Sequence, residues 1–320
     1  MSNNPAISIV IPVYNGQNFL YKTLGSIEKQ TFRDFEVICV DDMSTDNSLQ
    51  ILNEFASRDT RFKVLSRSDK GGCAVKGIIY AMPHCNGEYY FFCSQDDWIS
   101  YDCLEKVYNR AIETGADTVL PDMKWYYEDE EDHGGIYPPN EDYDTELTPQ
   151  EAFVKSLYWN IHGFSLRKMD KLKSLGFDDR YFNSCEYMGR LYYLNSNKVV
   201  FSKGTFYYRQ DNKDAITKSV SYLTFGELGT NVRLLNLLID NKIDKKITRR
   251  YLRKTTNSIK YWKRIFDENV ANFSAEKSEY IKNIIEDAKN DIWELSLKNR
   301  YYINILRMLL AGYRNSRGGK

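Results

Sequence analysis

The chain has 320 residues, of which 42% are hydrophobic, so it is long enough to bury one large core or two smaller ones. This hydrophobic content excludes an intrinsically disordered chain. Lys and Arg together number 44, as do Asp and Glu, and this balance argues against bulk electrostatic capture of nucleic acid as the main activity.

The cysteines and the N-terminus bear on the cellular compartment. No two cysteines form a CxxC pair, which is typical of small buried hydrophobic residues in a reducing compartment. They are Cys39, Cys73, Cys85, Cys93, Cys103 and Cys185. The short apolar run near the N-terminus has no basic segment before it, so we expect no signal peptide. No stretch approaches the ~20 apolar residues of a transmembrane helix. We therefore expect a cytoplasmic protein.

Strand and helix patterns alternate over the first 125 residues. Apolar, β-branched and aromatic runs predict buried strands at 6–15, 35–42, 62–67, 88–97 and 116–125. Between these runs, apolar residues recur at helical spacing, as Leu20, Leu24 and Ile27 do after the first strand. Strands that alternate with helices at this spacing predict a doubly wound, mostly parallel α/β sheet.

The rest of the chain has a different character. Residues 127–151 are acidic and contain Gly, Pro and Tyr, which predicts a long surface loop, and TPQE at 148–151 predicts a helix start with a capping box. After about residue 220, apolar stripes at helical spacing predict packed helices. The segment 297–320 mixes aromatic and aliphatic residues with Lys and Arg and has no acid. It fits either an anionic membrane surface or a helix docked on its own domain.

Polar residues follow four of the predicted strands. They are Pro12–Asn15, Asp41–Asp42, Arg67 and Asp96–Asp97. Ligands of open α/β sheets bind outside the carboxyl ends of the strands, so we expect these groups to form one site. Each group taken singly also fits helix capping or turn chemistry, but four of them on one edge favour a binding site.

Three strings resemble the family 2 glycosyltransferases of the GT-A fold. They are SIVIPVYNG at 8–16, VICVDDMSTD at 37–46 and SQDDW at 94–98. Weaker similarity continues through GFDDRYFNSCEYMGR and YYRQDN, so the resemblance covers roughly the first two thirds of the chain. It implies an inverting enzyme of the bacterial surface-polysaccharide type.

The resemblance also implies the domain organisation. A GT-A domain is expected at about 1–220, with a nucleotide-sugar half at about 1–125 and an acceptor half at about 126–220. Residues 221–320 are then a helical C-terminal region with a basic tail.

In the family, the turn after the first strand holds the nucleobase, which implies Pro12, Tyr14 and Asn15 here. The acid after the second strand reads the edge of the base. By position this acid is Asp42, with Asp41 as its neighbour. These five residues are therefore expected to bind the nucleotide-sugar.

The acids after the fourth strand hold the ribose and a divalent cation in the family, which implies Asp96 and Asp97. Mn²⁺ or Mg²⁺ suits such oxygen ligands. The family usually has a further acid where this chain has Ser94, which we expect to line the nucleotide-sugar site. We expect one of the two aspartates to ligate the metal and the other to hold ribose or a water. Capping of the following helix is the alternative for the pair.

Three cations are expected beside the donor. Arg67 and Lys76 bracket the glycine turn at Gly71–Gly72, and Lys76 stands near the place of an Arg-Asn pair that is usual in the family. Arg209 matches a basic residue that often closes over the diphosphate, and a surface ion pair is the alternative for it. No GxGxxG follows the first strand, which counts against a dinucleotide-dependent dehydrogenase.

Inversion at the anomeric carbon needs a base for the proton of the acceptor hydroxyl. The family commonly places this base in a Glu-Asp pair, and this chain has Glu186 followed by Tyr187. The resemblance therefore implies Glu186 as the base, with Asp178 or Asp179 as the fallback. His162 is expected to make a local hydrogen bond rather than to line the acceptor pocket.

The expected reaction moves a sugar from a nucleoside diphosphate sugar, with UDP as the expected nucleotide, to a hydroxyl of a glycan or a lipid-linked oligosaccharide. A divalent cation assists, and contact through 297–320 would hold the enzyme at the inner face of the cell membrane. The departures at Ser94 and Tyr187 leave one alternative open, a non-catalytic nucleotide- or glycan-binding protein on the same fold. A nucleotidyltransferase is disfavoured, because YNGQNF is not a basic, glycine-rich loop.

Overall fold

The chain divides into two compact units. The sheet unit comprises Met1–Asp179 and Met188–Asp214, and the helical unit comprises Arg180–Tyr187 and Ala215–Lys320. The computed structural model describes residues 4–128, 134–181, 183–213, 215, 218 and 220–298, with backbone only for 297 and 298.

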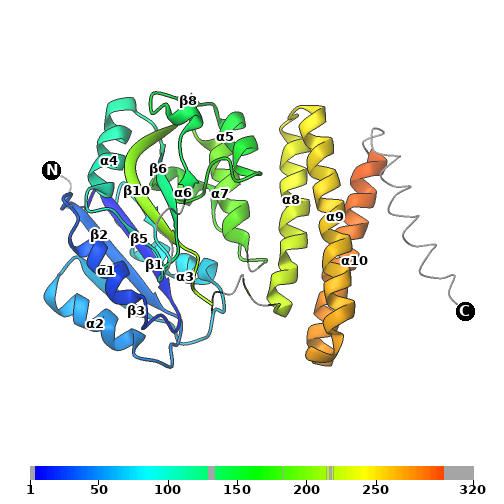
Figure 1. Cartoon of the computed structure of the whole chain (residues 1–320), viewed down its shortest axis with the longest axis horizontal. Helices are drawn as coiled ribbons and strands as arrows, with labels where there is room; N and C mark the ends of the chain where they lie inside the picture. Colours follow the sequence, from blue (N-terminus) through cyan, green and yellow to red (C-terminus); the bar gives the residue numbers. More distant parts are fainter. Residues whose placement is uncertain are drawn as a thin grey trace, which may run out of the picture. The chain divides into compact units, whose positions relative to one another are not determined.

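Within the described residues, ten strands form one sheet in the sheet unit (Figure 1). Their order is β3-β2-β1-β4-β9-β6-β10-β5, with β7 beside β6 and β8 beside β10. The strands are β1 Ile7–Val13, β2 Phe35–Asp41, β3 Phe62–Ser66, β4 Tyr89–Phe92, β5 Trp98–Ile99, β6 Thr118–Tyr126, β7 Gly135–Ile136, β8 Glu146–Leu147, β9 Leu166–Lys168 and β10 Val199–Arg209.

The longest strand pairs are parallel. β1 pairs in parallel with β2 and β4, β2 with β3, and β6 with β10. The short strand β9 runs antiparallel between β4 and β6 and joins the two parallel halves. The predicted doubly wound, mostly parallel sheet is confirmed. β9 was not predicted, because three residues give too short a pattern to be distinguished from a loop.

Helices cover both faces of the sheet. The core on one face contains residues of α1 Leu20–Glu28, α2 Ser48–Arg58 and α4 Cys103–Thr114. The core on the other face contains residues of α3 Ala74–Ala81, α6 Met169–Leu175 and the part of α7 Ser184–Asn195 that belongs to the sheet unit. Alternate residues of β1 supply both cores: Ile9 and Ile11 enter the first and Val10 the second. Burial on both faces explains why this strand is apolar at every position except Ser8.

The predicted loop at 127–151 contains two short strands. β7 pairs with β6, and β8 pairs with β10, both antiparallel. Two residues in each strand leave no readable alternation, so the sequence indicated only a loop. The predicted capping box is confirmed, because the Thr148 and Glu151 side chains each bond the backbone N–H of the other at the start of α5 Pro149–Ser156.

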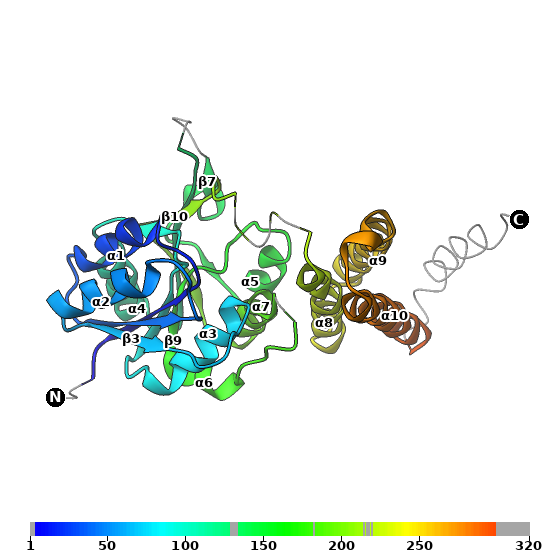
Figure 2. The ribbon, with the colours of Figure 1, turned by 90° about the horizontal axis from the view of Figure 1, so that it is seen from below.

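Three helices pack together in the helical unit (Figure 2). They are α8 Glu227–Asp240, α9 Lys245–Asn269 and α10 Ala275–Lys298. Their shared core includes Leu235, Leu252 and Ile281, as the helical stripes predicted. Tyr251 of α9 donates its hydroxyl to Oδ1 of Asn231 on α8 at 3.0 Å inside this core. The pair fixes the register of the two helices, since a buried polar group without its partner is costly.

No helix in the described part of the chain is both long enough and apolar enough to cross a bilayer. Most of the predicted membrane-contact segment 297–320 lies outside the described residues.

Candidate active site

The carboxyl ends of β1, β2 and β3 lie side by side. Val13 is opposite Asp41, and Asp41 is opposite Ser66 in the parallel register. Beyond the strands, the N–H of Asp42 donates to the carbonyl of Val13 at 2.8 Å, and the N–H of Arg67 donates to that of Asp41 at 3.0 Å. Three of the polar groups predicted at strand ends are therefore neighbours.

Asp42 is a buried carboxylate that fastens the glycine turn. Its Oδ1 accepts the N–H of Gly71 at 2.7 Å and its Oδ2 that of Gly72 at 2.8 Å. Nε of Arg67 lies 3.0 Å from Oδ1. A β-carbon on Gly71 would lie 2.9 Å from the same oxygen, so this approach depends on glycine. The chain itself engages both oxygens of Asp42.

Arg67 is held by further contacts within the same turn. Its Nη2 donates to the carboxylate of Asp69 at 3.0 Å, and its Nη1 donates to the backbone carbonyl of Lys76 at 3.2 Å. Lys76 is half-buried on α3, so the two cations do bracket the glycine turn as predicted. The side chain of Arg67 is only 9% exposed, so most of it serves the turn.

Asp41 is buried as well, but one of its oxygens is unused. Oδ2 accepts the N–H of Ser44 at 3.3 Å. Oδ1 is buried and has no hydrogen-bond donor among the described residues. An unsatisfied buried carboxylate oxygen is costly, so its presence at a strand end points to a ligand that donates to it.

The turn after β1 is tied to the loops after β2 and β4. The Gln95 side chain accepts the N–H of Tyr14 at 2.8 Å and donates to its carbonyl at 3.1 Å. Asn15 has φ of +50° and accepts the N–H of Thr45 at 2.8 Å, and its own N–H donates to Oγ of Ser44 at 3.1 Å. These bonds hold the turn in a left-handed conformation that Asn tolerates better than most residues.

Two residues of this turn differ in what they present to solvent. Pro12 packs against α3, where a β-carbon on Gly77 would lie 2.9 Å from its own β-carbon. Tyr14 is 38% exposed, and Nζ of Lys70 lies 4.0 Å from its ring centroid and 2.6 Å from its phenol oxygen. An exposed aromatic residue beside a cation suits stacking of a flat ligand that carries negative charge.

The two acids in the loop after β4, Asp96 and Asp97, have different environments, and the loop Ser94–Asp97 is called the acid loop below. Asp97 is fully buried, its Oδ1 accepts the N–H of Arg209 at 2.9 Å, and its Oδ2 has no donor among the described residues. Burial, followed by the charge of Asp96, raises the pKa of Asp97 well above its usual range. Asp96 is half-buried and accepts Nδ2 of Asn212 at 2.7 Å. Ser94 is half-buried too, and its carbonyl accepts the N–H of Asp97 at 3.3 Å.

Two cations share one group of aromatic rings beside these acids. Nζ of Lys22 lies 3.4 Å from the centroid of Trp98 and 4.2 Å from that of Tyr126. The guanidinium carbon of Arg209 lies 5.2 Å from the same two rings. Burial, then the neighbouring Arg209, lowers the pKa of Lys22. Two cations so close to each other favour the binding of an anion between them and the acid loop.

Arg209 also reaches the acid loop directly. Its Nε donates to the backbone carbonyl of Asp96 at 3.1 Å, and its Nη1 pairs with Asp211 at 3.0 Å. The ion pair given as the alternative for Arg209 is therefore present, but the arginine side chain is only 10% exposed and also links β10 to the acid loop.

The candidates for the base are in other parts of the chain. Asp178 is half-buried and Asp179 exposed, at the end of the first segment of the sheet unit. Glu186 is half-buried at the start of α7, in the stretch that belongs to the helical unit. The assignment of the base therefore stays a prediction.

His162 makes a local hydrogen bond in the protein interior, as expected. It is buried, and its Nε2 lies 2.8 Å from the carbonyl of Pro121. Burial lowers its pKa to about 4, so the ring is neutral near pH 7.

The acid loop fits a divalent cation that takes most of its ligands from elsewhere. In the described part of the chain, no three His, Cys, Asp or Glu side chains cluster as a complete metal site would require. Asp96 and the unused Oδ2 of Asp97 are hard oxygen donors of the kind that Mg²⁺ and Mn²⁺ prefer. One or two carboxylates are enough when a diphosphate supplies further oxygens.

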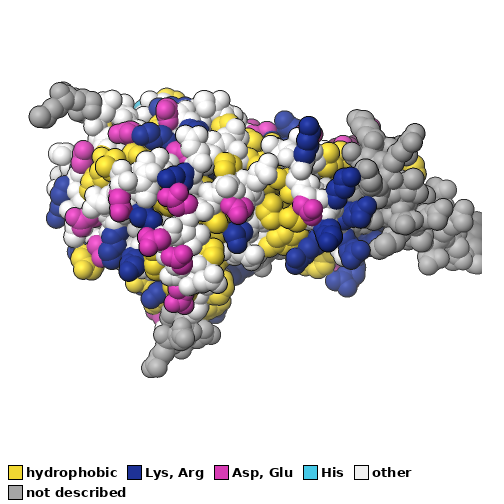
Figure 3. All heavy atoms as spheres, turned by 90° about the horizontal axis from the view of Figure 1, so that it is seen from above, with side chains coloured by type: hydrophobic (Ala, Val, Ile, Leu, Met, Phe, Trp, Pro, Cys, Tyr) yellow, Lys and Arg dark blue, Asp and Glu magenta, His cyan; other side chains and the backbone are white. Residues whose placement is uncertain are grey.

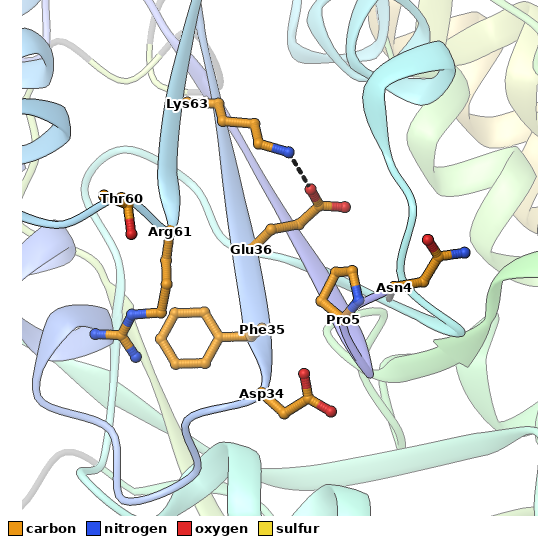
Figure 4. A pocket seen from close by; sticks show the side chains of 8 residues that line it. All are labelled: Asn4, Pro5, Asp34, Phe35, Glu36, Thr60, Arg61 and Lys63. Atoms are coloured by element: carbon orange, nitrogen blue, oxygen red, sulfur yellow. Dashed lines mark hydrogen bonds and ion pairs between the residues drawn. The ribbon is translucent and has the colours of Figure 1, made fainter. Parts of the chain in front are cut away.

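A surface hollow lies at the opposite edge of the sheet. Residues at the amino ends of β2 and β3 line it, among them Phe35, Glu36, Arg61 and Lys63 (Figure 4). Lys63 forms an ion pair of 2.7 Å with Glu36. This charge pair is satisfied within the chain, so the carboxyl edge is the better candidate for chemistry.

Several residues of the site escaped sequence reasoning. Gln95 and Lys70 contact the predicted residue Tyr14, and Lys22 shares the ring of Trp98 with Arg209, but none of the three belongs to a pattern that names a role. Gln95 had a weak signal, since it lies inside the SQDDW string. In the sequence, Lys22 and Lys70 look like any other surface lysine. Only their contacts in the folded chain distinguish them from the other lysines.

Comparison with known proteins identifies the relatives of the chain. Residues 8–176 match the family model described as Glycosyl transferase family 2. Glycosyltransferase GlyG of Streptococcus pneumoniae is 30% identical over 270 residues, which cover 74% of this chain and 87% of GlyG. Glycosyltransferase GlyA of the same organism is 28% identical over 66% of this chain, but the match spans only 31% of GlyA.

A similar fold occurs in a solved structure. Staphylococcus aureus TarS 1–349 in complex with UDP-GlcNAc superposes with a TM-score of 0.66, over 89% of this chain and 81% of that one. The two sequences are 20% identical in this comparison, so the likeness establishes the GT-A fold.

Proposed function

Because the chain belongs to glycosyl transferase family 2, a family of enzymes, we propose that it transfers a sugar from a UDP-sugar to a hydroxyl of a glycan or lipid-linked oligosaccharide. Transfer inverts the anomeric carbon and serves surface polysaccharide biosynthesis. The observation that carries this proposal is the meeting of the Tyr14 turn, the Asp41–Asp42 turn and the Asp96–Asp97 loop at one edge of the sheet. The UDP-GlcNAc complex of TarS supports UDP as the nucleotide.

The two acids after β2 divide the work on the nucleobase. Oδ1 of Asp41 is the better acceptor for a base N–H, because it has no donor within the described chain. Asp42 positions the glycine turn through Gly71 and Gly72 and acts on the base indirectly. The exposed ring of Tyr14 stacks on the base beside Asn15 and Pro12.

The acid loop handles the ribose and the cation. Asp96 is the more accessible acid and the first candidate for a ligand to Mn²⁺ or Mg²⁺. Asp97 contributes its unused Oδ2 or positions the loop, while Ser94 lines the ribose side. A bound cation would stabilise the charge on the departing UDP. Family members commonly use such a cation.

Protein cations supply further charge for the diphosphate. Arg209 and Lys22 lie beside the acid loop and share the rings of Trp98 and Tyr126. Arg209 already pairs with Asp211, and Lys22 lies over the same aromatic rings as the arginine. This favours a diphosphate bound within reach of both.

The proton of the acceptor hydroxyl goes to a carboxylate on the acceptor side. Glu186 is the first candidate and Asp178 or Asp179 the fallback. For inversion, the attacking hydroxyl, the anomeric carbon and the departing oxygen of UDP must lie in line. The general base must lie within hydrogen-bonding distance of the hydroxyl. The segment 297–320 is proposed to bring the enzyme to the inner face of the cell membrane, where a lipid-linked acceptor would be.

Calorimetric titration with UDP, GDP and CDP, each with and without Mn²⁺, tests the nucleotide and the cation together. We expect UDP to bind tightest and Mn²⁺ to strengthen its binding at least tenfold. Asp96→Asn should remove the effect of Mn²⁺ while leaving metal-free UDP binding nearly unchanged. Binding of no nucleotide under any condition would contradict the proposal and favour the non-catalytic alternative.

Turnover is tested by following UDP release from UDP-sugars with and without a glycan acceptor. We expect acceptor-stimulated release for one donor. If UDP binds but no UDP-sugar is turned over with any acceptor, the result supports the nucleotide site and contradicts the proposed transfer reaction.

A further inference from the structure

The charges of the helical unit are segregated between its helices. From Lys245 to Arg264, α9 has nine Lys or Arg and no Asp or Glu. In contrast, α10 has six acids and four bases over Ala275–Lys298. Charged surface helices usually mix both signs, because neighbouring opposite charges stabilise them. α9 therefore departs from an ordinary solvated helix.

All nine cations of this stretch are exposed. The α9 basic face is defined here by the six that lie between the ends of the stretch, Lys246, Arg249, Arg250, Arg253, Lys254 and Lys260. At 3.6 residues per turn they lie on the side of α9 opposite its buried residues Tyr251, Leu252 and Ile259. In Figure 3, Lys and Arg side chains gather over the helical unit.

Half of the cations of the α9 basic face form no ion pair among the described residues. Lys263 and Arg264, at its C-terminal end, pair with Asp267 and Glu268 one turn later. Lys246, Arg253 and Lys260 form no ion pair with a described residue. From Lys246 to Lys260 the face extends for about 21 Å along the helix at 1.5 Å per residue.

An exposed aromatic residue lies at the end of this face. Tyr261, next to Lys260, is 50% exposed, and its ring packs edge-on against Trp262 at 5.4 Å. Tyr and Trp are the residues that sit at the headgroup level of bilayers, and Lys and Arg are drawn to anionic lipids. A straight row of cations with an aromatic end fits a flat, anionic lipid surface better than it fits a compact ligand.

We propose that the α9 basic face binds the surface of a bilayer that contains anionic lipids. This surface is made of described residues of the helical unit and includes no residue of the segment 297–320. It goes beyond the proposed transfer reaction, because it holds the protein at a membrane whether or not a donor is bound.

The test is co-sedimentation of the full chain with vesicles of phosphatidylcholine alone or with about 30% phosphatidylglycerol. We expect binding to the anionic vesicles only, and its loss as salt rises from about 0.1 to 0.5 M. The double variant Arg253→Gln/Lys260→Gln should bind these vesicles about 25-fold more weakly, because each cation contributes about fivefold. Circular dichroism and thermal unfolding check that this variant, and each variant below, folds.

A matched control removes two exposed lysines from α10, Lys277→Gln/Lys282→Gln. We expect it to retain anionic-vesicle binding within about twofold. A third variant, Arg307→Gln/Arg314→Gln/Arg317→Gln, separates the contribution of the tail.

Any of three vesicle results overturns the proposal: no binding of the native chain to anionic vesicles, equal loss in the α9 and α10 variants, or loss in the tail variant but not in the α9 variant. α9-dependent binding of inorganic polyphosphate without vesicle binding also overturns it, since the partner is then a soluble polyanion. Each variant is also titrated with UDP. Because the proposed UDP site lies in the sheet unit, a change in vesicle binding with unchanged UDP binding tests the membrane proposal alone.

Discussion

The backbone N–H of Arg209 donates a hydrogen bond of 2.9 Å to Oδ1 of Asp97, a residue 112 positions earlier in the chain. Nε of the same arginine bonds the carbonyl of Asp96 at 3.1 Å. Through these two bonds, the end of β10 holds the acid loop after β4. The cation proposed to face the diphosphate thus also positions the acids proposed to hold its metal.

The first prediction separates the two acids after β2. Asp41→Asn should leave the thermal midpoint unchanged and weaken UDP binding at least tenfold, because Asn can present an N–H where the base needs an acceptor. Asp42→Asn should lower the free energy of unfolding by about 1–3 kcal/mol, because it loses the charge that faces two N–H groups and Arg67. Calorimetric titration and thermal unfolding measure both. If Asp41→Asn binds UDP like the native chain, Asp42 and not Asp41 contacts the nucleobase.

The second prediction concerns the glycine turn. Gly71→Ala should reduce the free energy of unfolding by about 1–3 kcal/mol, because the new β-carbon meets Oδ1 of Asp42 at 2.9 Å. Gly25→Ala is the matched control, since a β-carbon there meets nothing within 4 Å inside α1. It should raise the free energy of unfolding by about 0.5–1 kcal/mol. Urea unfolding of the two variants checks the opposite signs.

The third prediction tests the cations beside the acid loop. Arg209→Gln should weaken UDP binding by about 10–100-fold but leave the affinity for uridine nearly unchanged, because charge-assisted bonds to a diphosphate contribute about 1.5–3 kcal/mol. Lys22→Gln should do the same to a smaller extent, since Lys22 makes no bond to the acid loop. Titrations with UDP and uridine give the two affinities. An equal loss for both ligands would assign Arg209 to the loop structure alone.

The fourth prediction is a pH dependence of stability. The pKa of His162 is lowered from its ordinary value of 6.5 to about 4 in the folded chain, so its protonation favours unfolding. The neutral ring stabilises the fold above pH 6.5, and this contribution, up to about 3 kcal/mol, is lost as the pH falls toward 4. His162→Gln should therefore flatten the fall in thermal midpoint between pH 6.5 and 4.

His84 provides the control for this measurement, because it is exposed. His84→Gln should keep the acid sensitivity of the native chain. If His162→Gln and the native chain lose stability in parallel over this range, carboxylates rather than His162 cause the fall.

The fifth prediction concerns the base. Glu186→Gln should bind UDP like the native chain and lose transfer by at least 100-fold, because removal of a general base typically costs 10²–10⁴. Asp178→Asn and Asp179→Asn are the parallel variants. Retained transfer in Glu186→Gln with loss in either of the others would move the assignment to that aspartate.

Local sequence was enough to predict β1 to β4 and β6 and the edge where their polar ends meet, but not β5 or β7 to β10. β1 and β2 are apolar on both faces and end abruptly in polar residues, a pattern that depends on burial of the strand and not on its neighbours. The capping box at Thr148 and Glu151 is also local, since the two residues are three positions apart. Such features follow from short-range geometry, so the sequence contains them fully.

The contacts of the candidate active-site residues depend instead on how distant segments of the chain pack. Asp41 and Asp42 are adjacent and alike in sequence, yet one has both oxygens engaged by the glycine turn and the other leaves one oxygen unused. Asp97 is buried against β10, and Lys22 meets Arg209 over Trp98. No local pattern predicts these pairings, because they depend on the strand order and the crossovers that bring distant segments to one edge.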